Sequence, residues 1–413
     1  MTPAPLILEM APHPLSPSPE GRGGAGNKQA LPLIVEMATT DMSMALLLRR
    51  RILWMNGQGY NIRGLCADGP YAAKLRCQDF PVDTLPIARE LSPLKDLLSI
   101  FILRRYFKRA RPAIVFTHTP KAGIIGPIAA RLAGVPMVIH VVHGYFVHDH
   151  APFVHRTLGW LMEKWTACWA HCSLSQSRED VTNARRYGIT HRIKYLGNGV
   201  DVARFNPGLF AQDKRNELRS KIGIAKDKFV FGFVGRLVKE KGWRELTWTI
   251  RQILSERQDV HFLLIGPFEK EQNDAVASGE MDALTRNPAV THIPFVEKME
   301  EMYAVMDAFI LPTYREGVPR ALMEACAMEL PVIATRIRGC REVVVENETG
   351  LLVEPHSREE LHDAVRCLLA MGEGRRKELG RKARERVERE FNEQRIMRRF
   401  RLFCYLLLKK NIR

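Results

Sequence analysis

The sequence has no uninterrupted apolar run that is long enough to cross a bilayer. The longest run, near Leu97 to Leu103, is far shorter than the roughly 20 residues of a membrane-spanning helix. No secretory signal opens the chain either. These absences predict a soluble protein of the cytoplasm.

Cysteines and metal-binding patterns are also scarce. The chain has eight cysteines among its 413 residues, and their irregular positions favour reduced interior thiols over a disulfide framework. The closest pair, Cys168 and Cys172, lacks the usual spacing of zinc ligands. Neither an H-E-x-x-H motif nor a serine nucleophile elbow is present, which weighs against hydrolases. We expect no metal site, and we expect four neighbouring histidines to pack in the core or lie on the surface: His140, His148, His150 and His155.

Acidic residues are in deficit, because 62 Lys and Arg face 46 Asp and Glu and leave a net charge of +16. This charge predicts attraction to polyanions. Two stretches, residues 97–112 and 395–413, combine many cations with an apolar stripe. Such helices suit an anionic membrane surface, and they equally suit a core-facing helix with a solvated cationic face. No nucleic-acid-binding signature is present, so a nucleic-acid partner is not expected.

The order of apolar and amphipathic segments predicts the fold class. Residues 1–29 are rich in Pro, Gly and Ser, and are expected to be a disordered leader. Gly21 to Gly26 fits G-x-G-x-x-G, but no strand precedes it, so it is discounted. From Leu31, strand-like runs alternate with amphipathic runs, and a second such series begins at Lys228. We expect an α/β protein with two doubly wound parallel-sheet domains, residues 30–203 and 204–390, and a basic C-terminal helix, 391–413, packing back on the first domain.

One candidate site follows the strand-like AFILP run of the second domain. Pro319 is expected to be the first residue of a helix whose amino end, with Gly317 before it, forms an anion site. Glu316 precedes this helix, and Glu324 lies about 7.5 Å farther along its axis. Carboxylates do not bind phosphate, so their expected partners are the hydroxyls of a ribose and of a sugar.

A second candidate site follows the strand-like KFVFGFVGR run. Arg236 and Lys241 come after this strand and before the next helix. An arginine fork and a compact lysine charge can together neutralise a diphosphate, which is the main electrostatic task in glycosyl transfer from a nucleotide sugar. The alternative is that Arg236 and Lys241 are merely solvated loop residues. The Glu316 motif in the same domain weighs against this alternative.

These motifs, together with residues 197–207 and 331–355, resemble the retaining glycosyltransferases of family 4, which have the two-domain architecture called GT-B. The resemblance covers the chain from Leu31 to its end. It implies that Glu316 holds hydroxyls of the donor sugar, Glu324 the ribose, and Arg236 with Lys241 the diphosphate. The amides that follow Glu316 would complete the phosphate cradle, and Gly317, Val318 and Pro319 are the implied donor-binding residues of this loop. The chain has no Asp-x-Asp pair, so we expect metal-independent transfer without a bound cofactor.

Segments 116–134 and 138–146 look like the branch that extends polyprenyl-diphosphate-linked sugars in surface polysaccharide assembly. In relatives a histidine at the end of this strand approaches the donor sugar, and His143 matches it. His118 and Lys121 end a strand-like run and are expected to face the acceptor diphosphate. The implied reaction moves a hexose or N-acetylhexosamine from a nucleotide sugar, UDP-linked by expectation, to a lipid-linked saccharide at the inner membrane face. A nucleotide-sugar epimerase, transfer to a soluble acceptor and a non-catalytic binding protein are the alternatives.

Three departures from the family pattern stand out. Glu329 occupies a position where glycine is usual and where a left-handed backbone is expected to close the helix, at a cost of about 1 kcal/mol. Arg336 stands where many relatives have Asp. Residues 38–44 replace the usual Gly-Gly loop after the first strand, which affects the expected acceptor recognition.

Overall fold

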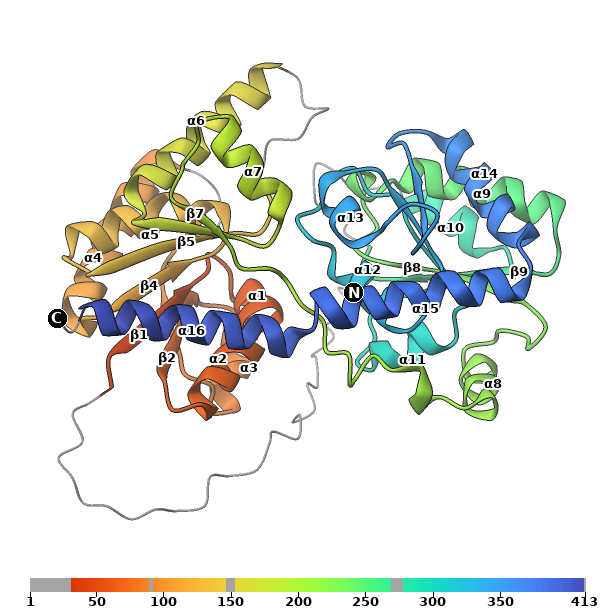
Figure 1. Cartoon of the computed structure of the whole chain (residues 1–413), viewed down its shortest axis with the longest axis horizontal. Coiled ribbons are helices and arrows are strands. Elements are labelled where there is room, and N and C mark those ends of the chain that lie inside the picture. Colours follow the sequence, from red (N-terminus) through yellow and green to blue (C-terminus); the bar gives the residue numbers. More distant parts are fainter. Residues whose placement is uncertain (1–30, 89–91, 146–152, 269–277, 412–413) are drawn as a thin grey trace, which may run out of the picture.

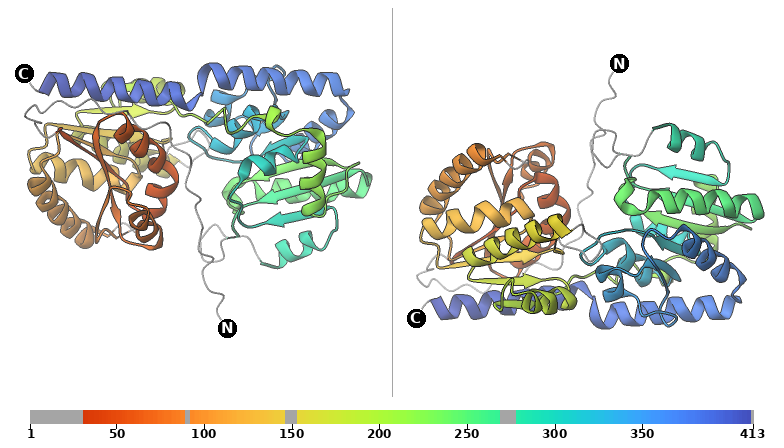
Figure 2. Two further views of the ribbon diagram at one scale, coloured as in Figure 1. Left: turned by 90° about the horizontal axis from the view of Figure 1, so that it is seen from below. Right: turned by 90° about the horizontal axis from the view of Figure 1, so that it is seen from above.

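Two parallel β-sheets, one in each half of the chain, form the framework of the molecule (Figure 1). The structure is a computed structural model and describes residues 31–88, 92–145, 153–268 and 278–411. The expected leader at residues 1–29 lies outside the described residues, as do His148 and His150. Helices cover the sheets in both halves, and the predicted α/β fold with two doubly wound domains is confirmed (Figure 2).

The first sheet has the strand order β3-β2-β1-β4-β5-β6-β7. Its strands are β1 Leu33–Met37, β2 Asn61–Ala67, β3 Val82–Leu85, β4 Ile114–Thr117, β5 Met137–Val142, β6 Cys172–Ser175 and β7 Ile193–Tyr195. Successive residues of β1 point to opposite faces, since Ile34 packs in one hydrophobic cluster and Val35 in another. A sheet that is buried on both faces explains why its strands read as short, nearly continuous apolar runs.

The second sheet has the order β10-β9-β8-β11-β12-β13. Its strands are β8 Phe229–Val234, β9 Val260–Ile265, β10 Val290–Ile293, β11 Ala308–Leu311, β12 Val332–Thr335 and β13 Leu351–Val353. In both sheets the strand order reverses at the middle, between β1 and β4 and between β8 and β11. Ligands of such sheets bind outside the carboxyl ends of the strands at this point.

The helices complete the two halves. Those of the first half are α1 Asp41–Ser43, a π-helical turn at Met44–Leu48, α2 Arg49–Gly57, α3 Pro70–Cys77, α4 Pro93–Ala110, α5 Pro120–Leu132, α6 Phe153–Trp169 and α7 Arg178–Arg186. Those of the second half are α8 Gln212–Lys221, α9 Trp243–Glu256, α10 Ser278–Thr285, α11 Met299–Ala304, α12 Arg320–Ala327, α13 Arg338–Val343 and α14 Arg358–Ala370, with 3-10 turns at Pro207–Leu209 and Lys239–Lys241. The connection between the halves contains the turn-rich residues 197–208.

The C-terminal tail forms two helices, α15 Glu373–Glu390 and α16 Glu393–Asn411. α15 runs along the second half and α16 crosses to the first (Figures 1 and 2). Where the two helices meet, Val200 N donates to Phe391 O at 2.8 Å, so the tail is tied to the interdomain connection. Phe400 and Cys404 of α16 are fully buried in the core of the first sheet.

A polar contact between α7 and α13 also joins the halves. Arg338 of α13 pairs with Asp180 of α7 at 2.9 Å, and both side chains are largely buried. Ser177 Oγ, at the amino end of α7, donates to Glu342 of α13 at 3.0 Å. The two sheets are therefore held with their carboxyl edges facing one another across a cleft.

Candidate active site

A cavity of about 250 Å³ lies between the two halves at the carboxyl ends of the strands. The first half, the connection, the second half and α16 all contribute to its wall. The lining residues are Leu47, Arg50, Arg51, His143, Gln176, Gly197, Asn198, Gly199, Glu316, Gly317, Val318, Arg320, Glu393, Ile396 and Met397. Of the residues predicted from the sequence, His143, Glu316, Gly317 and Val318 are among them.

Two glycines allow the halves to touch at the edge of this cavity. A Cβ atom on Gly317 would lie 1.8 Å from the backbone oxygen of His143. Across the contact, Gly144 has a φ of +118°, and a Cβ there would lie 2.6 Å from Gly317 Cα. Only glycine fits both positions, because a side chain would separate the two backbones. The loop that carries Glu316 is thereby brought against the loop that carries His143.

Glu316 forms an ion pair with Lys241, the last residue of the 3-10 turn after β8. Gly242 then turns the chain into α9 with a φ of 72°, and a Cβ there would lie 2.0 Å from Pro312 O. The close approach of Gly242 to the segment after β11 brings Lys241 beside Glu316. Arg236 follows β8 by two residues at the same edge of the sheet and is half-buried. The two cations that were predicted to bind a diphosphate thus both follow β8.

The loop before α12 differs from the prediction at one residue. α12 begins at Arg320, and Pro319 is its N-cap, with an extended backbone (φ −69°, ψ 119°). Because proline has no backbone N–H, the predicted amide cradle can only use the N–H groups of Gly317 and Val318 in this loop. Asn198 Nδ2 donates to Val318 O at 3.0 Å and so ties this loop to the interdomain connection.

Glu324 lies in the fifth position of α12, behind the cavity wall. Its Oε2 accepts a hydrogen bond from the Tyr303 hydroxyl at 3.1 Å, and its Oε1 lies 3.5 Å from Arg320 Nε. Burial raises the pKa of Glu324, and Arg320 opposes this effect. Glu324 therefore reaches the cavity through Arg320, which lines it.

His143 follows β5 by one residue, and its Nε2 lies 3.0 Å from Nδ1 of His118. Burial, with the positive charge of Arg51 as the next cause, lowers the pKa of His143 to about 3. His143 is therefore a neutral imidazole near pH 7.

His118 and Lys121, the predicted acceptor residues, are largely buried. The side chain of His118 is fully buried, and that of Lys121 is 5% exposed and pairs with Asp96 of α4 at 2.6 Å. Neither lines the cavity. Their predicted contact with an acceptor diphosphate stays a prediction, with Lys121 beside Asp96 of α4 and His118 beside the cavity residues Arg51 and His143.

Sequence reasoning missed Glu36 and Arg51. Glu36 is a buried carboxylate within the apolar strand β1, and both its oxygens accept hydrogen bonds from Arg51, a cavity residue. A lone charge inside an apolar strand was the available signal, because such a charge must find a partner.

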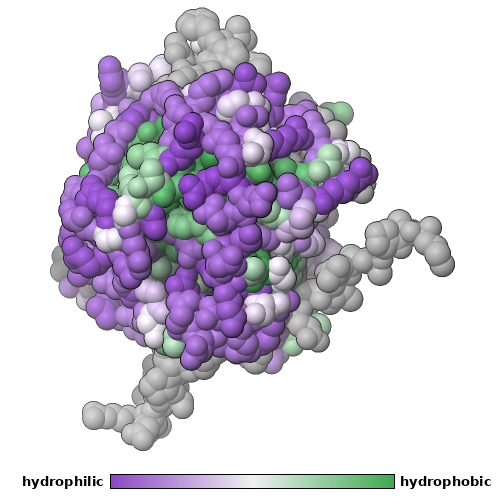
Figure 3. All heavy atoms as spheres, turned by 90° about the vertical axis from the view of Figure 1, so that its right-hand side faces the viewer, coloured by the Kyte–Doolittle hydropathy of each residue, from purple (hydrophilic) through white to green (hydrophobic). Residues whose placement is uncertain are grey.

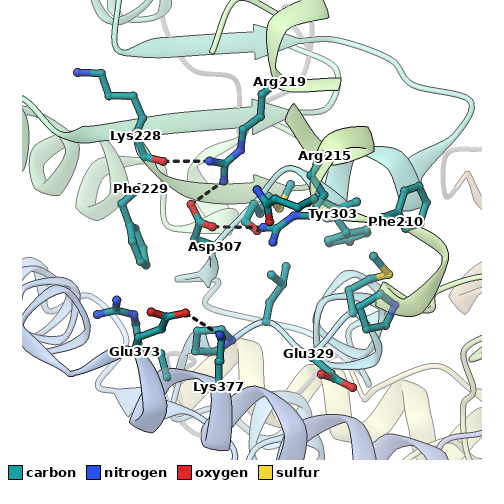
Figure 4. Close-up of a pocket in the computed structure, with 18 of the residues that line it drawn as sticks. Phe210, Arg215, Arg219, Lys228, Phe229, Tyr303, Asp307, Glu329, Glu373 and Lys377 are labelled. Atoms are coloured by element: carbon teal, nitrogen blue, oxygen red, sulfur yellow. Dashed lines mark hydrogen bonds and ion pairs between the residues drawn. The ribbon is translucent and has the colours of Figure 1, made fainter. Parts of the chain in front are cut away.

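A larger cavity of about 620 Å³ lies at the opposite, amino edge of the second sheet (Figure 4). Several of its charges neutralise one another: Arg219 pairs with Asp307 at 2.7 Å, and Lys377 pairs with Glu373 at 2.6 Å. It is distant from the carboxyl ends of the strands, where the predicted site residues gather. The interdomain cavity is therefore the candidate active site.

Comparisons with known proteins identify the family. Residues 44–199 match the model of the glycosyl transferase 4-like domain, and residues 214–386 match that of the glycosyl transferases group 1. The capsular polysaccharide biosynthesis glycosyltransferase CapM of Staphylococcus aureus is 31% identical over 369 residues, which cover 87% of this chain and 93% of CapM. The chain belongs to the group 1 glycosyltransferases. The predicted enzyme class is thus confirmed.

Other glycosyltransferases are also similar to this one. The UDP-Gal:alpha-D-GlcNAc-diphosphoundecaprenol alpha-1,3-galactosyltransferase of Escherichia coli is 30% identical over 277 residues, 65% of this chain and 69% of that protein. Among solved structures, Anabaena HepE in complex with UDP and glucose superposes with a TM-score of 0.76 at 18% identity, covering 90% of this glycosyltransferase and 99% of HepE. A Rickettsia africae glycosyltransferase superposes with a TM-score of 0.73 at 18% identity, covering 92% and 99%. These structures confirm the predicted GT-B fold.

Proposed function

We propose that this glycosyltransferase moves a hexose or N-acetylhexosamine from a UDP-linked sugar to a lipid-diphosphate-linked saccharide, with retention of configuration, in cell-surface polysaccharide biosynthesis. The observation that carries the proposal is the interdomain cavity, where Glu316 of one half and His143 of the other line a common space. Glycosyl transfer needs a donor and an acceptor in contact with water excluded, and a cleft between two domains provides this.

The second half, residues 204–390, is proposed to bind the donor. Glu316 would accept hydrogen bonds from sugar hydroxyls, and Glu324 from the ribose. Lys241 and Arg236 would neutralise the departing diphosphate, and the amides of Gly317 and Val318 would assist. Lys241 is already held beside the cavity by Glu316. No metal ion is required in this arrangement, since side-chain cations take its place.

The first half, residues 30–203, is proposed to bind the acceptor, with His143 contacting the transferred sugar. The name of the Escherichia coli relative supports both partners, because that enzyme takes UDP-Gal and a diphosphoundecaprenol-linked sugar. The HepE complexes with UDP-glucose and with UDP and glucose support a UDP-linked donor in the same fold.

A lipid-linked acceptor implies that the enzyme works at a membrane, and we propose the inner face of the plasma membrane. In the described part of the chain, no helix is long and apolar enough to span a bilayer. α4 and α6 instead flank α5 and expose large apolar side chains: Leu94, Leu97, Leu98, Phe101, Leu158, Leu161 and Trp165. Exposed cations of α4 accompany them: Lys95, Arg105, Lys108 and Arg109. This combination favours peripheral binding to an anionic surface.

The test is transfer of radiolabelled sugar from UDP-sugars to polyprenyl-diphosphate-linked saccharides, measured as label that enters the organic phase. The parent enzyme is expected to transfer label, and the Glu316→Gln variant to lose transfer, because an amide cannot accept the same hydrogen bonds as a carboxylate. Label found on a soluble saccharide would show that the acceptor is soluble and not lipid-linked. Conversion of the UDP-sugar without any acceptor would contradict transfer and indicate epimerisation.

A further inference from the structure

A chain of buried polar side chains runs from β1 to the wall of the candidate active site. It passes from Glu36 of β1 to Arg51 of α2, then to His118 after β4 and His143 after β5. The side chains of Glu36 and His118 are fully buried, and that of Arg51 is 14% exposed. Buried polar groups are costly unless each is hydrogen-bonded. The arrangement of these four side chains therefore constrains which nitrogen or oxygen carries each proton.

The guanidinium of Arg51 is held rigidly. Arg51 Nε donates to Glu36 Oε1 at 2.9 Å, and Nη2 donates to Oε2 at 2.6 Å, so the pair is bidentate. The Phe400 ring of α16 covers the guanidinium, with 4.5 Å between the Arg51 Cζ and the ring centroid. Arg51 Nη2 is then left 3.2 Å from His118 Nε2.

The proton positions follow from the donors available. A guanidinium donates hydrogen bonds and cannot accept them, so His118 Nε2 must accept. The pKa of His118 lies well below its usual value through burial, followed by the charge of Arg51, and its imidazole therefore carries one proton. That proton must be on Nδ1, which donates to His143 Nε2 at 3.0 Å. Glu36 Oε2 is 3.5 Å from His118 Nε2 and already accepts from Arg51, so it is the weaker partner for that nitrogen.

The same reasoning extends to His143. Its Nε2 is occupied as an acceptor, and as a neutral imidazole it carries its proton on Nδ1. His143 also forms a side-chain hydrogen bond with Gln176, which lines the cavity. Gln176 accepts this proton through its side-chain oxygen, and a hydroxyl oxygen of a substrate can take the place of Gln176 as the acceptor.

We propose that Arg51 and His118 are positioning residues that fix His143 in the neutral tautomer with its proton on Nδ1, so that His143 donates, and does not accept, a hydrogen bond toward the transferred sugar. The contact with the sugar rests on the proposed function, whereas the tautomer does not. In this proposal His118 acts on the donor side through His143, a role separate from the predicted contact with the acceptor. Holding a histidine in one tautomer through a buried partner can matter greatly for turnover.

The direct test is ¹⁵N NMR of the full chain labelled at histidine nitrogen, with the His143 signals assigned by their loss in His143→Gln. The expected spectrum shows a protonated Nδ1 and an unprotonated Nε2 at His143. In His118→Ala the signals should move toward the other tautomer or a mixture of the two. A protonated Nε2 in the parent, or unchanged His143 signals in His118→Ala, would overturn the proposal. If His118→Ala does not fold, the parent spectrum alone decides.

Kinetics provide the second readout. His118→Ala should lower kcat/KM roughly ten- to a hundredfold through the loss of one directed hydrogen bond, mainly in kcat. His118→Asn keeps an N–H donor near the position of Nδ1 and should restore most of the loss. The matched control is His261→Asn, a buried histidine of β9 whose Nε2 is bonded to Thr291 at 2.9 Å, far from the cavity. Equal kcat/KM in folded His118→Ala and the parent would overturn the proposal. An inactive parent would contradict the proposed function and leave the NMR result to decide the tautomer.

Discussion

The two halves of the molecule share one architecture and differ in their surfaces. Each is a parallel sheet covered by helices, and each places its carboxyl edge at the cleft. The end of the molecule formed by the second half is mainly hydrophilic, with hydrophobic residues visible in a hollow (Figure 3). Among its described residues, the strongly exposed large hydrophobics are Leu209 and Phe295, whereas the first half exposes many, most of them on α4 and α6.

This difference shows that the fold leaves the outer helix faces free to adapt to different partners. The buried strands of both halves obey the same rule of continuous apolar runs, because both sheets are covered. The outer faces obey no such rule, so a lipid-facing surface and a water-facing surface can coexist on one fold. The functional division we propose, acceptor and membrane on one half and donor on the other, follows this contrast.

The largest expected effect tests whether α16 belongs to the first half. Phe400 is fully buried, and its ring centroid lies 4.9 Å from that of Phe116. Phe400→Ala should lower the free energy of unfolding by about 3–5 kcal/mol through lost contacts and a cavity, as measured by chemical denaturation. Leu402→Ala, at a 57% exposed position of the same helix, is the control and should change stability by less than about 0.5 kcal/mol. Equal effects of the two changes would show that α16 is not docked there.

The substitution with the next largest expected effect tests whether the second half binds the donor. Lys241→Met removes the cation paired with Glu316 and should lower kcat by about 10²–10³, because one preorganised charge at the departing group is lost. Lys239→Met is the control, since Lys239 lies on the same turn and is exposed. Steady-state transfer assays measure both. A similar kcat for Lys241→Met and the parent would remove Lys241 from the proposed site.

A substitution with a smaller expected effect tests whether α4 of the first half binds the membrane surface. Phe101 of α4 is 59% exposed, and Phe101→Ser should weaken binding to anionic vesicles roughly tenfold, since burying one large apolar side chain contributes about 1.5–3 kcal/mol. Phe295→Ser, at a 49% exposed phenylalanine of the second half, should leave binding unchanged. Vesicle sedimentation over a range of salt concentrations measures both. Loss of binding in Phe295→Ser alone would reverse the assignment of the two surfaces.

The smallest effect compares one backbone position in each half. Glu329 has the left-handed φ of 59° that the sequence predicted, and Asp79 of the first half has a φ of 54°. Glu329→Gly should raise the free energy of unfolding by about 1 kcal/mol, because glycine adopts this conformation without strain. Asp79→Gly should raise the free energy of unfolding by less, since Asp tolerates the left-handed region better than Glu. Thermal unfolding measures the stability of both variants. A loss of stability in Glu329→Gly would contradict the inference that the backbone of Glu329 is strained.

The sequence allowed most of the framework to be predicted. The strand-like KFVFGFVGR and AFILP runs form β8 and β11, as expected. The edge strands β3 and β10 were missed, because their residues are only partly buried and carry a weak apolar signal.

The site was only partly predictable. Glu316, predicted from the motif after the AFILP run, and His143, predicted from the family resemblance, both line the interdomain cavity. The burial of His118 and the pairing of Lys121 with Asp96 depend on how α2 and α4 pack, which no local pattern encodes. The Glu36–Arg51 pair joins residues 15 positions apart, and its role emerges only when β1, β4 and β5 lie side by side.

The proposed division of roles between the two halves is tested by measuring donor binding and vesicle binding in the same two variants. Calorimetry with a UDP-sugar and sedimentation with anionic vesicles would be run on Lys241→Met and Phe101→Ser. Lys241→Met is expected to lose UDP-sugar affinity and keep vesicle binding, and Phe101→Ser is expected to show the reverse. Loss of UDP-sugar affinity in Phe101→Ser, or of vesicle binding in Lys241→Met, would contradict the division of roles between the two halves.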